Sequence, residues 1–450
     1  MVEQFDVIVI GSGQGGDPLA RECANRGKKT ALIEREHIGG TCINTGCTPT
    51  KTMIASGRVA YLAKRAAEYG ITTGPISTNM EAVRARKRAM VDEFRSSSEK
   101  KDYSTPNLEV ICESASFTGP KTLKAGEREL TAETIVIDTG SAPFIPPIKG
   151  LDQVPYLDNA SIMELDEVPF HLIILGGSYI SVEFAQLFRR LGSEVTIVEK
   201  APHLVAREDE DVSEALEKVF TEDGITFHLK VSAIEVTGEA GNLQVVLDNG
   251  EKLSASHLLV ALGRRPNTVD LKLKVPGIET LPNGAVKVDE FLETNVKGVY
   301  AIGDVNGGPQ FTHISYDDFR ILRSTLLDGK KASTKGRLVP YVVFTDPQLG
   351  HVGVSEKEAK AQKIPYKLFS MPMEDVARAY EIGESRGFMK VLVDPNSKVI
   401  IGAAVLGYEG GEIMNMLQIA LMGKLPYPVL KEGIFSHPTL AEGFNNLFDE

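Results

Sequence analysis

The chain has 450 residues, of which 42% are hydrophobic and 24% charged, and its formal net charge is −12. This composition is typical of a globular protein with two or three domains. The negative charge disfavours nonspecific binding to nucleic acid or anionic membranes, and no window approaches the roughly 18 apolar residues of a membrane span. The N-terminus, MVEQFDVIVIG, lacks a signal-peptide pattern, so we expect a cytoplasmic protein with neither a nucleic-acid nor a membrane partner.

The first predicted element is an apolar strand, FDVIVI, that leads directly into the glycine turn GSGQGG. A helical stretch and a second strand ending at Glu34 follow, and this order is the β–turn–helix–β unit of dinucleotide binding. Gly11 permits the tight turn, and Gly13 lets backbone N–H groups approach a pyrophosphate. Gly16, or else Gly15, allows the helix to pack closely on the strand, and Glu34 is placed to accept hydrogen bonds from a ribose.

The stretch GGTCINTGCTPTK contains two of the four cysteines, Cys42 and Cys47, and ends with Lys51. Four cysteines do not make a disulfide scaffold, so a close pair in a reducing compartment is expected to be catalytic or metal-binding. Zinc clips usually have two residues between their cysteines and need a second ligand pair, whereas Cys23 and Cys112 lie in unrelated contexts. A redox pair is the favoured interpretation, with a metal clip or two unrelated buried thiols as the alternatives, and no metal site is predicted.

The dinucleotide unit occurs a second time in HLIILGGSYISVEFAQLFRRLGSEVTIVEK, where Glu199 follows Gly176 at the same spacing as in the first copy. Two copies in matching context indicate nucleotide binding far more strongly than a single glycine loop. Ser178 and Ser181 replace the later glycines, so the second ligand is expected to bind less tightly and to exchange. A diffusible nicotinamide cofactor fits this expectation better than a tightly held flavin.

Over its whole length the chain resembles the class I pyridine nucleotide–disulfide oxidoreductases, the family of lipoamide dehydrogenase, glutathione reductase and mercuric reductase. The motifs that carry the resemblance are, in chain order, GSGQGG, GGTCINTGCTPTK, IDTGSAP, GGSYISVEF, ALGRRPN, TNVKGVYAIGDV, FTDPQLGHVG and SHPTLAE. The resemblance implies an α/β fold with two Rossmann-like dinucleotide-binding domains, for FAD and NAD(P), and a C-terminal α+β dimerisation domain.

The implied FAD domain is discontinuous, with residues 1–150 and 274–333. The NAD(P) domain, 151–273, is inserted between its two parts, and a dimer-interface domain, 334–450, follows. The Pro- and Gly-containing stretches SAPFIPPIKG and RRPN, and the Lys/Gly-rich stretch DGKKASTKGR, are typical of places where a chain passes between domains.

The resemblance also implies roles for the redox residues. In this family the first helix after the flavin-binding turn carries the disulfide against one face of the flavin. Cys47 then corresponds to the flavin-proximal, charge-transfer thiol, and Cys42 to the interchange thiol that attacks the substrate. Lys51 would place its ammonium group near flavin N5 with Glu183 as its partner, and Tyr179 matches the tyrosine that gates the nicotinamide pocket.

Several further positions match cofactor-binding residues of the family, among them Asp304 for the FAD ribityl chain and Thr139 and Gly140 for the turn past the flavin. The FAD set is Gly11, Gly13, Gly15, Gly16, Glu34, Thr41, Lys51, Thr139, Gly140, Gly303 and Asp304. The NAD set is Gly176, Gly177, Tyr179, Glu183, Glu199 and Gly263. NAD(H) is expected over NADP(H), because the carboxylate of Glu199 would repel a 2′-phosphate, although Lys200 and Arg207 nearby leave NADP(H) open.

His437 is followed by Pro438, Thr439 and Glu442 at the family spacing. The resemblance implies that His437 exchanges a proton with substrate thiols, while Glu442 orients and charge-stabilises its imidazole. In the family this dyad reaches the disulfide of the other subunit. The resemblance therefore implies an obligate homodimer with an active site shared between subunits.

The expected activity is FAD-dependent NAD(P)H oxidoreduction through a Cys42–Cys47 disulfide. Its expected substrate is a small-molecule or carrier-borne disulfide or dithiol, reversibly oxidised as by dihydrolipoamide dehydrogenase, although CINTGCTPTK differs from the CLNVGCIPSK-like form of lipoamide enzymes. A mercuric-reductase-like metal-ion reductase is the alternative, but that activity depends on a C-terminal cysteine pair and no cysteine follows Cys112. A flavoprotein redox sensor without turnover is a third reading, disfavoured by the complete set of catalytic side chains.

Overall fold

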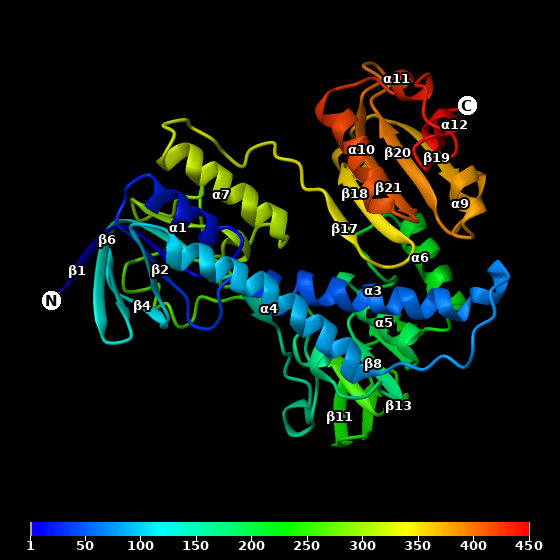
Figure 1. Cartoon of the computed structure of the whole chain (residues 1–450), viewed down its shortest axis with the longest axis horizontal. Helices are drawn as coiled ribbons and strands as arrows, with labels where there is room; N and C mark the ends of the chain where they lie inside the picture. Colours follow the sequence, from blue (N-terminus) through cyan, green and yellow to red (C-terminus); the bar gives the residue numbers. More distant parts are fainter. Residues whose placement is uncertain (1, 450) are drawn as a thin grey trace.

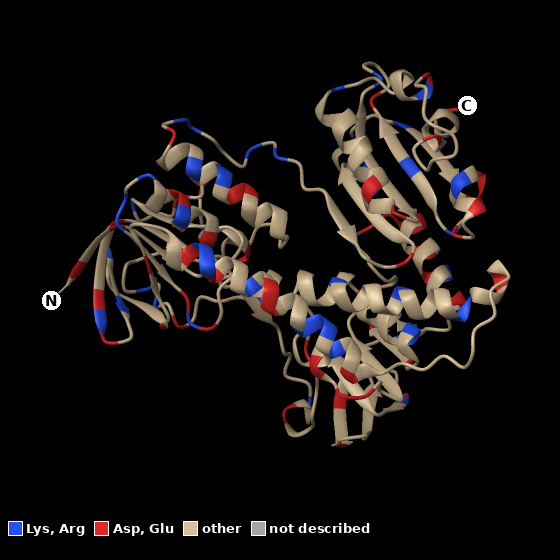
Figure 2. Cartoon of the chain, in the orientation of Figure 1, with Lys and Arg blue, Asp and Glu red and all other residues tan. Residues whose placement is uncertain are grey.

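The computed structural model of the protein describes residues 2–449. Figure 1 shows three regions, each built around its own β-sheets, with two long helices, α3 (Cys47–Lys64) and α4 (Met80–Ser104), running between them. Basic side chains lie along α4, and acidic and basic side chains are interspersed over all three regions in Figure 2. No helix within residues 2–449 is both long and apolar enough to cross a membrane.

The first region contains a seven-stranded sheet of order β3-β2-β1-β6-β5-β4, with β16 also paired to β6. Its strands are β1 (Glu3–Ile10), β2 (Thr30–Ile33), β3 (Leu108–Ile111), β4 (Ala115–Gly119), β5 (Thr122–Ala125), β6 (Arg128–Ile137) and β16 (Val299–Ala301). Strands β1, β2, β3, β6 and β16 pair in parallel, and the β4–β5–β6 part is antiparallel. Because β16 pairs with β6, a distant part of the chain returns to this sheet.

The helices of this region lie between these strands in the chain or follow β16. They are α1 (Gly16–Asn25), α2 (Gly40–Asn44), α3, η1 (Ala66–Tyr69), α4, η4 (Gly303–Asn306) and α7 (Thr312–Leu326). The side chain of Asn79 caps α4 by accepting a hydrogen bond from the backbone N–H of Ala82 at 2.9 Å. Ile8, Val9 and Val136 are fully buried, as expected for parallel strands that are covered on both faces.

The second region has a parallel four-stranded sheet of order β10-β9-β8-β14 and an antiparallel sheet of order β11-β12-β13. Its elements are η2 (Leu151–Gln153), η3 (Ser161–Glu164), β8 (His171–Leu175), α5 (Tyr179–Leu191), β9 (Glu194–Glu199), α6 (Glu210–Glu222), β10 (Thr226–Leu229), β11 (Ala233–Glu239), β12 (Asn242–Leu247), β13 (Lys252–Ala255) and β14 (His257–Val260). The chain enters through β7 (Ser141–Pro143) and leaves through β15 (Arg264–Pro266). These two connections pair with each other in an antiparallel ribbon.

The third region is an antiparallel five-stranded sheet of order β17-β18-β21-β20-β19 with helices on it. Its elements are β17 (Tyr341–Val343), β18 (Gln348–Gly353), α8 (Glu356–Gln362), β19 (Lys367–Pro372), η5 (Met373–Asp375), α9 (Ala377–Glu381), β20 (Phe388–Val393), β21 (Ile400–Gly407), α10 (Gly410–Met422), α11 (Pro428–Lys431) and α12 (Gly443–Leu447). The three regions give the predicted α/β fold with two nucleotide-type units and a C-terminal α+β unit. The residue boundaries proposed for the domains stay a prediction.

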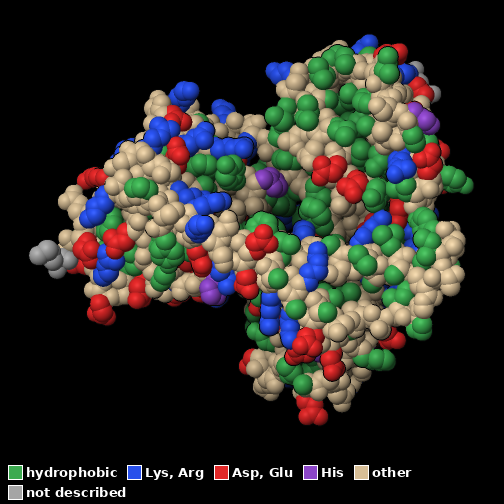
Figure 3. Space-filling model, viewed as in Figure 1, with side chains coloured by type: hydrophobic (Ala, Val, Ile, Leu, Met, Phe, Trp, Pro, Cys, Tyr) green, Lys and Arg blue, Asp and Glu red, His purple; other side chains and the backbone are tan. Residues whose placement is uncertain are grey.

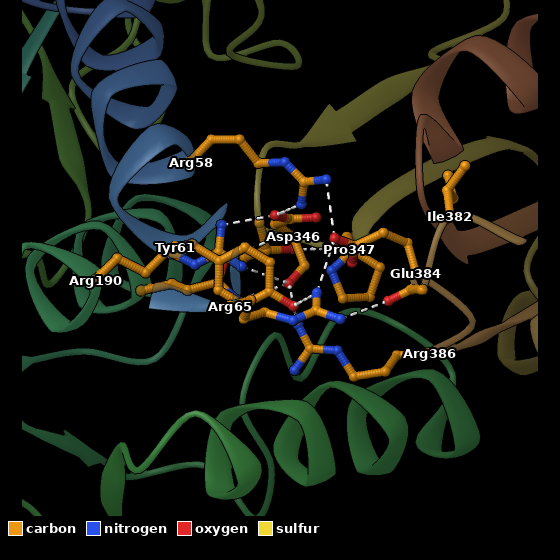
Figure 4. A network of polar contacts seen from close by, with 12 residues as sticks. Arg58, Tyr61, Arg65, Arg190, Asp346, Pro347, Ile382, Glu384 and Arg386 are labelled. Carbon is orange, nitrogen blue, oxygen red and sulfur yellow. Dashed lines mark hydrogen bonds and ion pairs between the residues drawn. The ribbon is translucent and has the colours of Figure 1, made fainter. Parts of the chain in front are cut away.

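The side chain of Tyr61, on α3, is surrounded by four arginines from all three regions (Figure 4). The guanidinium carbons of Arg190 and Arg65 lie 4.0 and 4.8 Å from the centre of its ring, and those of Arg58 and Arg386 lie at 5.4 and 5.9 Å. Arginines at such distances attract the ring face through its quadrupole. A tyrosine on α3 is thus the centre of a contact between regions.

Two buried carboxylates balance these arginines. Asp346 accepts a hydrogen bond from Arg190 at 2.7 Å and another from Arg58, and Glu384 accepts one from Arg58 and one from Arg65, each at 3.0 Å. Burial opposes ionisation of Asp346, but Arg190 and Arg58 together hold the pKa of this carboxyl below its ordinary value. The network therefore fixes α3 against the third region with ionised partners.

We expect Asp346→Asn to lower the free energy of unfolding by about 3 kcal/mol at neutral pH, because it leaves buried guanidinium groups without their charge partner. Since the pKa of Asp346 is lowered in the folded state, its contribution is present above a pH of about 4 and is lost as the pH falls through the folded-state value. Urea unfolding followed by circular dichroism at several pH values measures both effects.

Glu68→Gln provides the control, because Glu68 pairs with Arg65 across one helical turn while its own side chain is 58% exposed. Loss of this exposed pair is expected to leave the free energy of unfolding nearly unchanged. Equal losses in the two variants would contradict the role given to Asp346.

Candidate functional site

The first glycine turn joins β1 to α1 and needs glycine for two different reasons. Gly11 has a φ of +101°, which L side chains rarely adopt, and a Cβ there would lie 2.2 Å from the carbonyl oxygen of Asp138. A Cβ on Gly16 would lie 2.4 Å from the carbonyl oxygen of Gly11, so this glycine lets the helix start close to the strand. Gly13 and Gly15 lie between them, and Gly16 is the first residue of α1.

Glu34 directly follows β2 and closes the turn from the other side. Its carboxylate accepts hydrogen bonds from the backbone N–H of Ser12 at 3.0 Å, from the Ser12 hydroxyl at 2.7 Å and from the backbone N–H of Glu36 at 2.9 Å. An ionised carboxylate has about four acceptor positions, so one is left for a ligand. The predicted ribose contact of Glu34 stays a prediction.

Asp138, at the end of β6, is a residue of this turn that the sequence analysis missed. It is buried and accepts a hydrogen bond from the backbone N–H of Gly16 at 2.7 Å. Burial, with the negative charges of Asp304 and Asp318 adding to it, raises the pKa of Asp138 well above its ordinary value. The only available signal was an aspartate at the end of an apolar strand, in IDTG.

The start of α1 fits the pyrophosphate of FAD. The N–H of Gly16 donates to Asp138 and that of Asp17 to the carbonyl of Gly13 at 3.0 Å, and the next residue is Pro18, which has no N–H. A phosphate would therefore meet the N–H groups of the glycine turn that precedes α1, with the positive end of the helix dipole behind them. Thr41, on α2, lies beside Cys42 and next to the loop that follows Glu34.

The predicted turn past the flavin joins the two connecting segments. The Thr139 hydroxyl donates to the carbonyl of Asn267 at 2.8 Å, and the backbone N–H of Asn267 donates to Gly140 at 3.0 Å. The Ser141 hydroxyl donates to Asp304 at 2.6 Å. Because Gly303 and Asp304 are the first residues of η4, this aspartate lies where β16 ends, beside the turn.

The second glycine turn joins β8 to α5, as the repeated motif predicts. Glu199 accepts hydrogen bonds from the backbone N–H groups of Gly177 at 2.5 Å and Ala201 at 2.7 Å, and Gly176 is the first residue after β8. No side chain within the described chain caps α5, and the buried hydroxyl of Ser181 has no hydrogen-bond partner there. Free donors at a helix start again fit a nucleotide phosphate.

Gly263 and Tyr179 are the other residues predicted for the second nucleotide site. Gly263 follows β14, and its carbonyl accepts a hydrogen bond from the backbone N–H of Phe144 at 2.9 Å. Tyr179 is the first residue of α5, and its hydroxyl donates to Glu208 at 2.8 Å. Glu208 was not identified from the sequence, because its partner is set by tertiary contact.

The two cysteines lie on consecutive helices, Cys42 on α2 and Cys47 as the first residue of α3, and both are free thiols in this structure. The expectation that the first helix after the flavin-type turn carries both is wrong, since α1 is that helix and Gly46 separates α2 from α3. The break places Cys47 at the N-terminus of a long helix, where the helix dipole favours a thiolate.

The two thiols have opposite acidities. A hydrogen bond from Cys42, with contributions from Thr312 and Lys51, lowers the pKa of Cys47 to about 6 even though burial acts the other way. The same hydrogen bond and burial raise the pKa of Cys42 well above its ordinary value. The pair is therefore built to hold one thiolate, at Cys47, and one thiol, at Cys42.

Lys51 and Glu183 form an ion pair beside these thiols. Lys51 Nζ lies 2.7 Å from Glu183 Oε2, while the other oxygen of Glu183 accepts the backbone N–H of Phe344 at 2.9 Å. Lys51 also lies over the Phe344 ring, 4.7 Å from its centre. Thr312, at the start of α7, places its hydroxyl oxygen 3.2 Å from Cys47 Sγ, and no sequence pattern had identified it.

His437 and Glu442 also form the predicted pair, with His437 Nδ1 lying 2.8 and 3.0 Å from the two carboxylate oxygens. Its imidazole is 67% exposed. Glu442 directly precedes α12, which Figure 1 shows on the outer side of the third region, away from the start of α3. Within residues 2–449, no polar contact joins His437 to either cysteine.

Two nucleotide-type turns with a dithiol between them are the features of a dinucleotide-dependent disulfide oxidoreductase. The model of the pyridine nucleotide-disulphide oxidoreductases matches residues 5–318, and the model of their dimerisation domain matches residues 339–448. The chain belongs to the pyridine nucleotide-disulphide oxidoreductase family. This membership supports the use of FAD and a pyridine nucleotide, and a dimerisation domain is present.

The relatives carry different names. RclA of Escherichia coli, a probable pyridine nucleotide-disulfide oxidoreductase, is 34% identical over 99% of each chain. A structure of its Cu(II) complex, which describes it as an HOCl-induced flavoprotein disulfide reductase, has a TM-score of 0.91 and covers 98% of this chain and 99% of that one. The mercuric reductase of Staphylococcus aureus is 31% identical over 98% of this chain and 81% of its own length. A dihydrolipoyl dehydrogenase of Chlamydia muridarum is 34% identical over 98% and 96%, respectively.

We expect Thr312→Val to raise the pKa of Cys47 by about one unit, because a hydrogen bond to the thiolate is lost. In the reduced protein, iodoacetamide alkylation of Cys47, quantified by peptide mass spectrometry, should titrate with a midpoint near pH 6 in the wild type and at a higher pH in the variant. Thr312→Ser keeps the hydroxyl and should titrate as the wild type does. Identical midpoints for Val and Ser would contradict this contact.

Proposed function

We propose that the protein is a FAD-dependent NAD(P)H oxidoreductase that reduces a disulfide substrate through Cys42 and Cys47, reversibly and in the manner of a dihydrolipoamide dehydrogenase. The observation that carries the proposal is the position of the dithiol, with Cys47 at the start of α3 and the Thr312 hydroxyl oxygen 3.2 Å from its sulfur. A thiolate at the start of α3, next to Lys51 and Thr312, and a neighbouring neutral thiol are what a two-electron relay needs. Two unrelated thiols would not need this arrangement.

We assign the FAD site to the domain formed by residues 1–150 and 274–333 and the NAD(P) site to the domain formed by residues 151–273, as the motifs imply. FAD bound at the first turn would supply the acceptor for a nicotinamide hydride and the donor of two electrons to the disulfide. Lys51, held by Glu183, places a positive charge beside Cys47 and stabilises its thiolate. Asp304, Thr139 and Gly140 line the passage between the two nucleotide sites.

Exchange with the substrate then uses the chain's own thiols. The Cys42 sulfur, after losing its proton, attacks a substrate disulfide and forms a mixed disulfide, and the first substrate thiol leaves with a proton. The Cys47 thiolate next attacks the Cys42 sulfur, closes the Cys42–Cys47 disulfide and releases the second substrate sulfur as a thiolate, which takes a proton from solvent. Because the pKa of Cys42 is raised, the first step needs a base, and the His437–Glu442 dyad is the one the chain offers.

We further propose that the nicotinamide nucleotide is NAD(H) in preference to NADP(H). The carboxylate of Glu199 is held at the second turn by two backbone donors, and a 2′-phosphate at this place would meet its negative charge. Lys200 and Arg207 are the nearby basic residues that would have to reach such a phosphate, and both are exposed.

Reduction of a metal ion is the second candidate function. It is favoured by the relatives named mercuric reductase and by the Cu(II) complex of the similar RclA structure. Against mercury stands the absence of any cysteine after Cys112 in the sequence. A copper- or mercury-reducing activity would have to use Cys42 and Cys47 alone.

Anaerobic titration with NADH and then with NADPH distinguishes the two functions. The proposal expects a new long-wavelength absorbance from the Cys47 thiolate beside the flavin, and its loss when oxidised lipoamide is added. Cys42→Ser should abolish lipoamide reduction while sparing electron transfer to artificial dyes. Reoxidation by cupric or mercuric ions but not by lipoamide would establish the metal reductase, and absence of the band would refute a dithiol relay.

We propose that the protein is a homodimer in which the partner subunit's His437 serves Cys42. The exposed face of α10 carries Met416, Ile419 and Met422, with exposures of 43, 67 and 63%, and the space-filling view shows hydrophobic side chains gathered over this region (Figure 3). Residues three apart on a helix share one face, so this is a continuous apolar stripe. Such stripes mark protein interfaces.

Mixed dimers test the shared site. Cys42→Ser and His437→Gln homodimers should each lack lipoamide reductase activity, the second by about 100-fold or more because proton transfer is lost. Coexpressed, the two chains form heterodimers in which one of the two sites has both residues intact, so activity should reappear at up to half of the wild-type value per heterodimer. If each chain served its own cysteines, the purified heterodimer would stay inactive.

A further inference from the structure

Glu208 is a buried carboxylate for which the dithiol mechanism has no use. Its side chain is 1% exposed, and a single oxygen, Oε1, accepts hydrogen bonds from Tyr179 at 2.8 Å and from Tyr341 at 2.7 Å. Tyr179 begins α5 at the second nucleotide turn, whereas Tyr341 begins β17 in the third region. The two tyrosine rings also stack, with centres 5.4 Å apart. One carboxylate thus joins the nucleotide turn to the third region.

Both hydroxyls act as donors to this carboxylate. Burial, with the negative charge of Glu208 adding to it, raises the pKa of Tyr179 and of Tyr341 above the ordinary value, so both phenols keep their protons. Hydrogen bonds to an ionised acceptor are stronger than those between neutral groups. The two donors share one oxygen, so each lowers the acceptor strength that this oxygen offers to the other.

The backbone around Glu208 is fixed on both sides. On one side, the N–H of Val205 donates to the carbonyl of Gly177 in the nucleotide turn, and the N–H of Glu208 donates to Val205, each at 2.8 Å. On the other side, Asp209 lies 3.0 Å from the buried ammonium group of Lys390. Asp209 also accepts the backbone N–H groups at the start of α8 at 2.7 and 3.0 Å. The backbone at Glu208 is therefore held in place by contacts that do not involve the Tyr179 ring.

The stack continues from Tyr341 toward the dithiol. Tyr341 lies parallel to Phe311, with ring centres 5.4 Å apart and an interplanar angle of 3°. The ring of His351 also stacks on Tyr341, with ring centres 4.9 Å apart. Phe311 directly precedes Thr312, whose hydroxyl contacts Cys47. The carboxylate therefore anchors one end of a row of packed rings that reaches the thiolate site.

From these contacts we infer that Glu208 is a positioning residue that holds Tyr179 closed over the nicotinamide pocket, with Tyr341 as a competing donor that weakens this hold. We call the three residues the tyrosine latch. The inference rests on the proposed role of Tyr179 as the nicotinamide gate. If the ring must move for nicotinamide to enter, breaking its bond to Glu208 is part of the binding free energy. The apparent affinity then falls with the fraction of open protein.

Removing the bond should therefore tighten nicotinamide binding. We expect Tyr179→Phe, which keeps the ring and removes the bond, to lower the dissociation constant of NAD⁺ by about tenfold, as loss of a charge-assisted bond predicts. Glu208→Gln keeps the shape and leaves a neutral acceptor, so it should lower the dissociation constant by a smaller factor. The double variant should show no gain beyond that of Tyr179→Phe, because both changes act on the same contact. Isothermal titration calorimetry of the flavin-loaded dimer with NAD⁺ measures this dissociation constant without requiring catalytic turnover.

Two matched controls separate a latch from a general change in the site. ADP-ribose lacks nicotinamide, so its affinity should be the same in the wild type and in all latch variants. Tyr341→Phe removes the competing donor and leaves the carboxylate to Tyr179, so it should weaken NAD⁺ binding, opposite in sign to Tyr179→Phe. If Glu208→Gln does not retain flavin, the opposite changes in NAD⁺ affinity expected for Tyr179→Phe and Tyr341→Phe still test the latch.

The latch would be overturned by equal shifts for NAD⁺ and ADP-ribose, by shifts of the same sign in the two Tyr→Phe variants, or by NAD⁺ affinities within twofold of the wild type. Failure of the proposed function has a different signature. It would appear in the wild-type protein itself, as bound flavin that neither NADH nor NADPH reduces.

Discussion

The position of helix α3 is the constraint on which the rest of the site depends. Its first residue is Cys47, its second turn carries Lys51, and its later turns carry Arg58 and Tyr61 into the contact with the third region. A helix is stiff over this length, so fixing its C-terminal half by buried ion pairs also fixes the thiolate at its N-terminus. The reacting sulfur is thereby positioned by residues that never contact it, and the acidity of Cys47 follows from where the helix begins.

Buried carboxylates recur wherever two regions meet. Asp346 and Glu384 join the third region to α3, while Glu208 and Asp209 join it to the nucleotide turn. Each carboxylate is expensive to bury and is stable only with its donors in place. Such contacts contribute less to net stability than apolar packing would, but they tolerate one geometry only. This suits an enzyme in which a nucleotide site, a dithiol and a third region must hold a common arrangement.

Under the proposed mechanism, one chain alone does not hold all the groups that the reaction needs. Cys42 is held as a neutral thiol by its neighbour and by burial, yet the imidazole that would take its proton lies elsewhere in the chain and is well exposed. An exposed apolar stripe on α10, in the region that matches the family's dimerisation domain, provides the surface on which a second subunit would supply it. A requirement for proton transfer and a requirement for burial of apolar surface thus point to the same assembly.

The sequence alone determined the class of fold and both nucleotide turns, and it proposed the Cys42–Cys47 relay, because these depend on short motifs with fixed spacing. The Lys51–Glu183 and His437–Glu442 pairs followed from the family resemblance that these motifs carry. The sequence did not show that Gly46 breaks the cysteine segment into two helices, nor did it identify Asp138, Thr312 or Glu208. Each of these three acts through a partner distant in sequence: the N–H of Gly16, the thiol of Cys47 and the hydroxyl of Tyr341. Only packing of the regions brings such groups within hydrogen-bond distance, so no local sequence pattern predicts these contacts. For the same reason, only the tertiary structure decided the environment that gives each thiol its acidity.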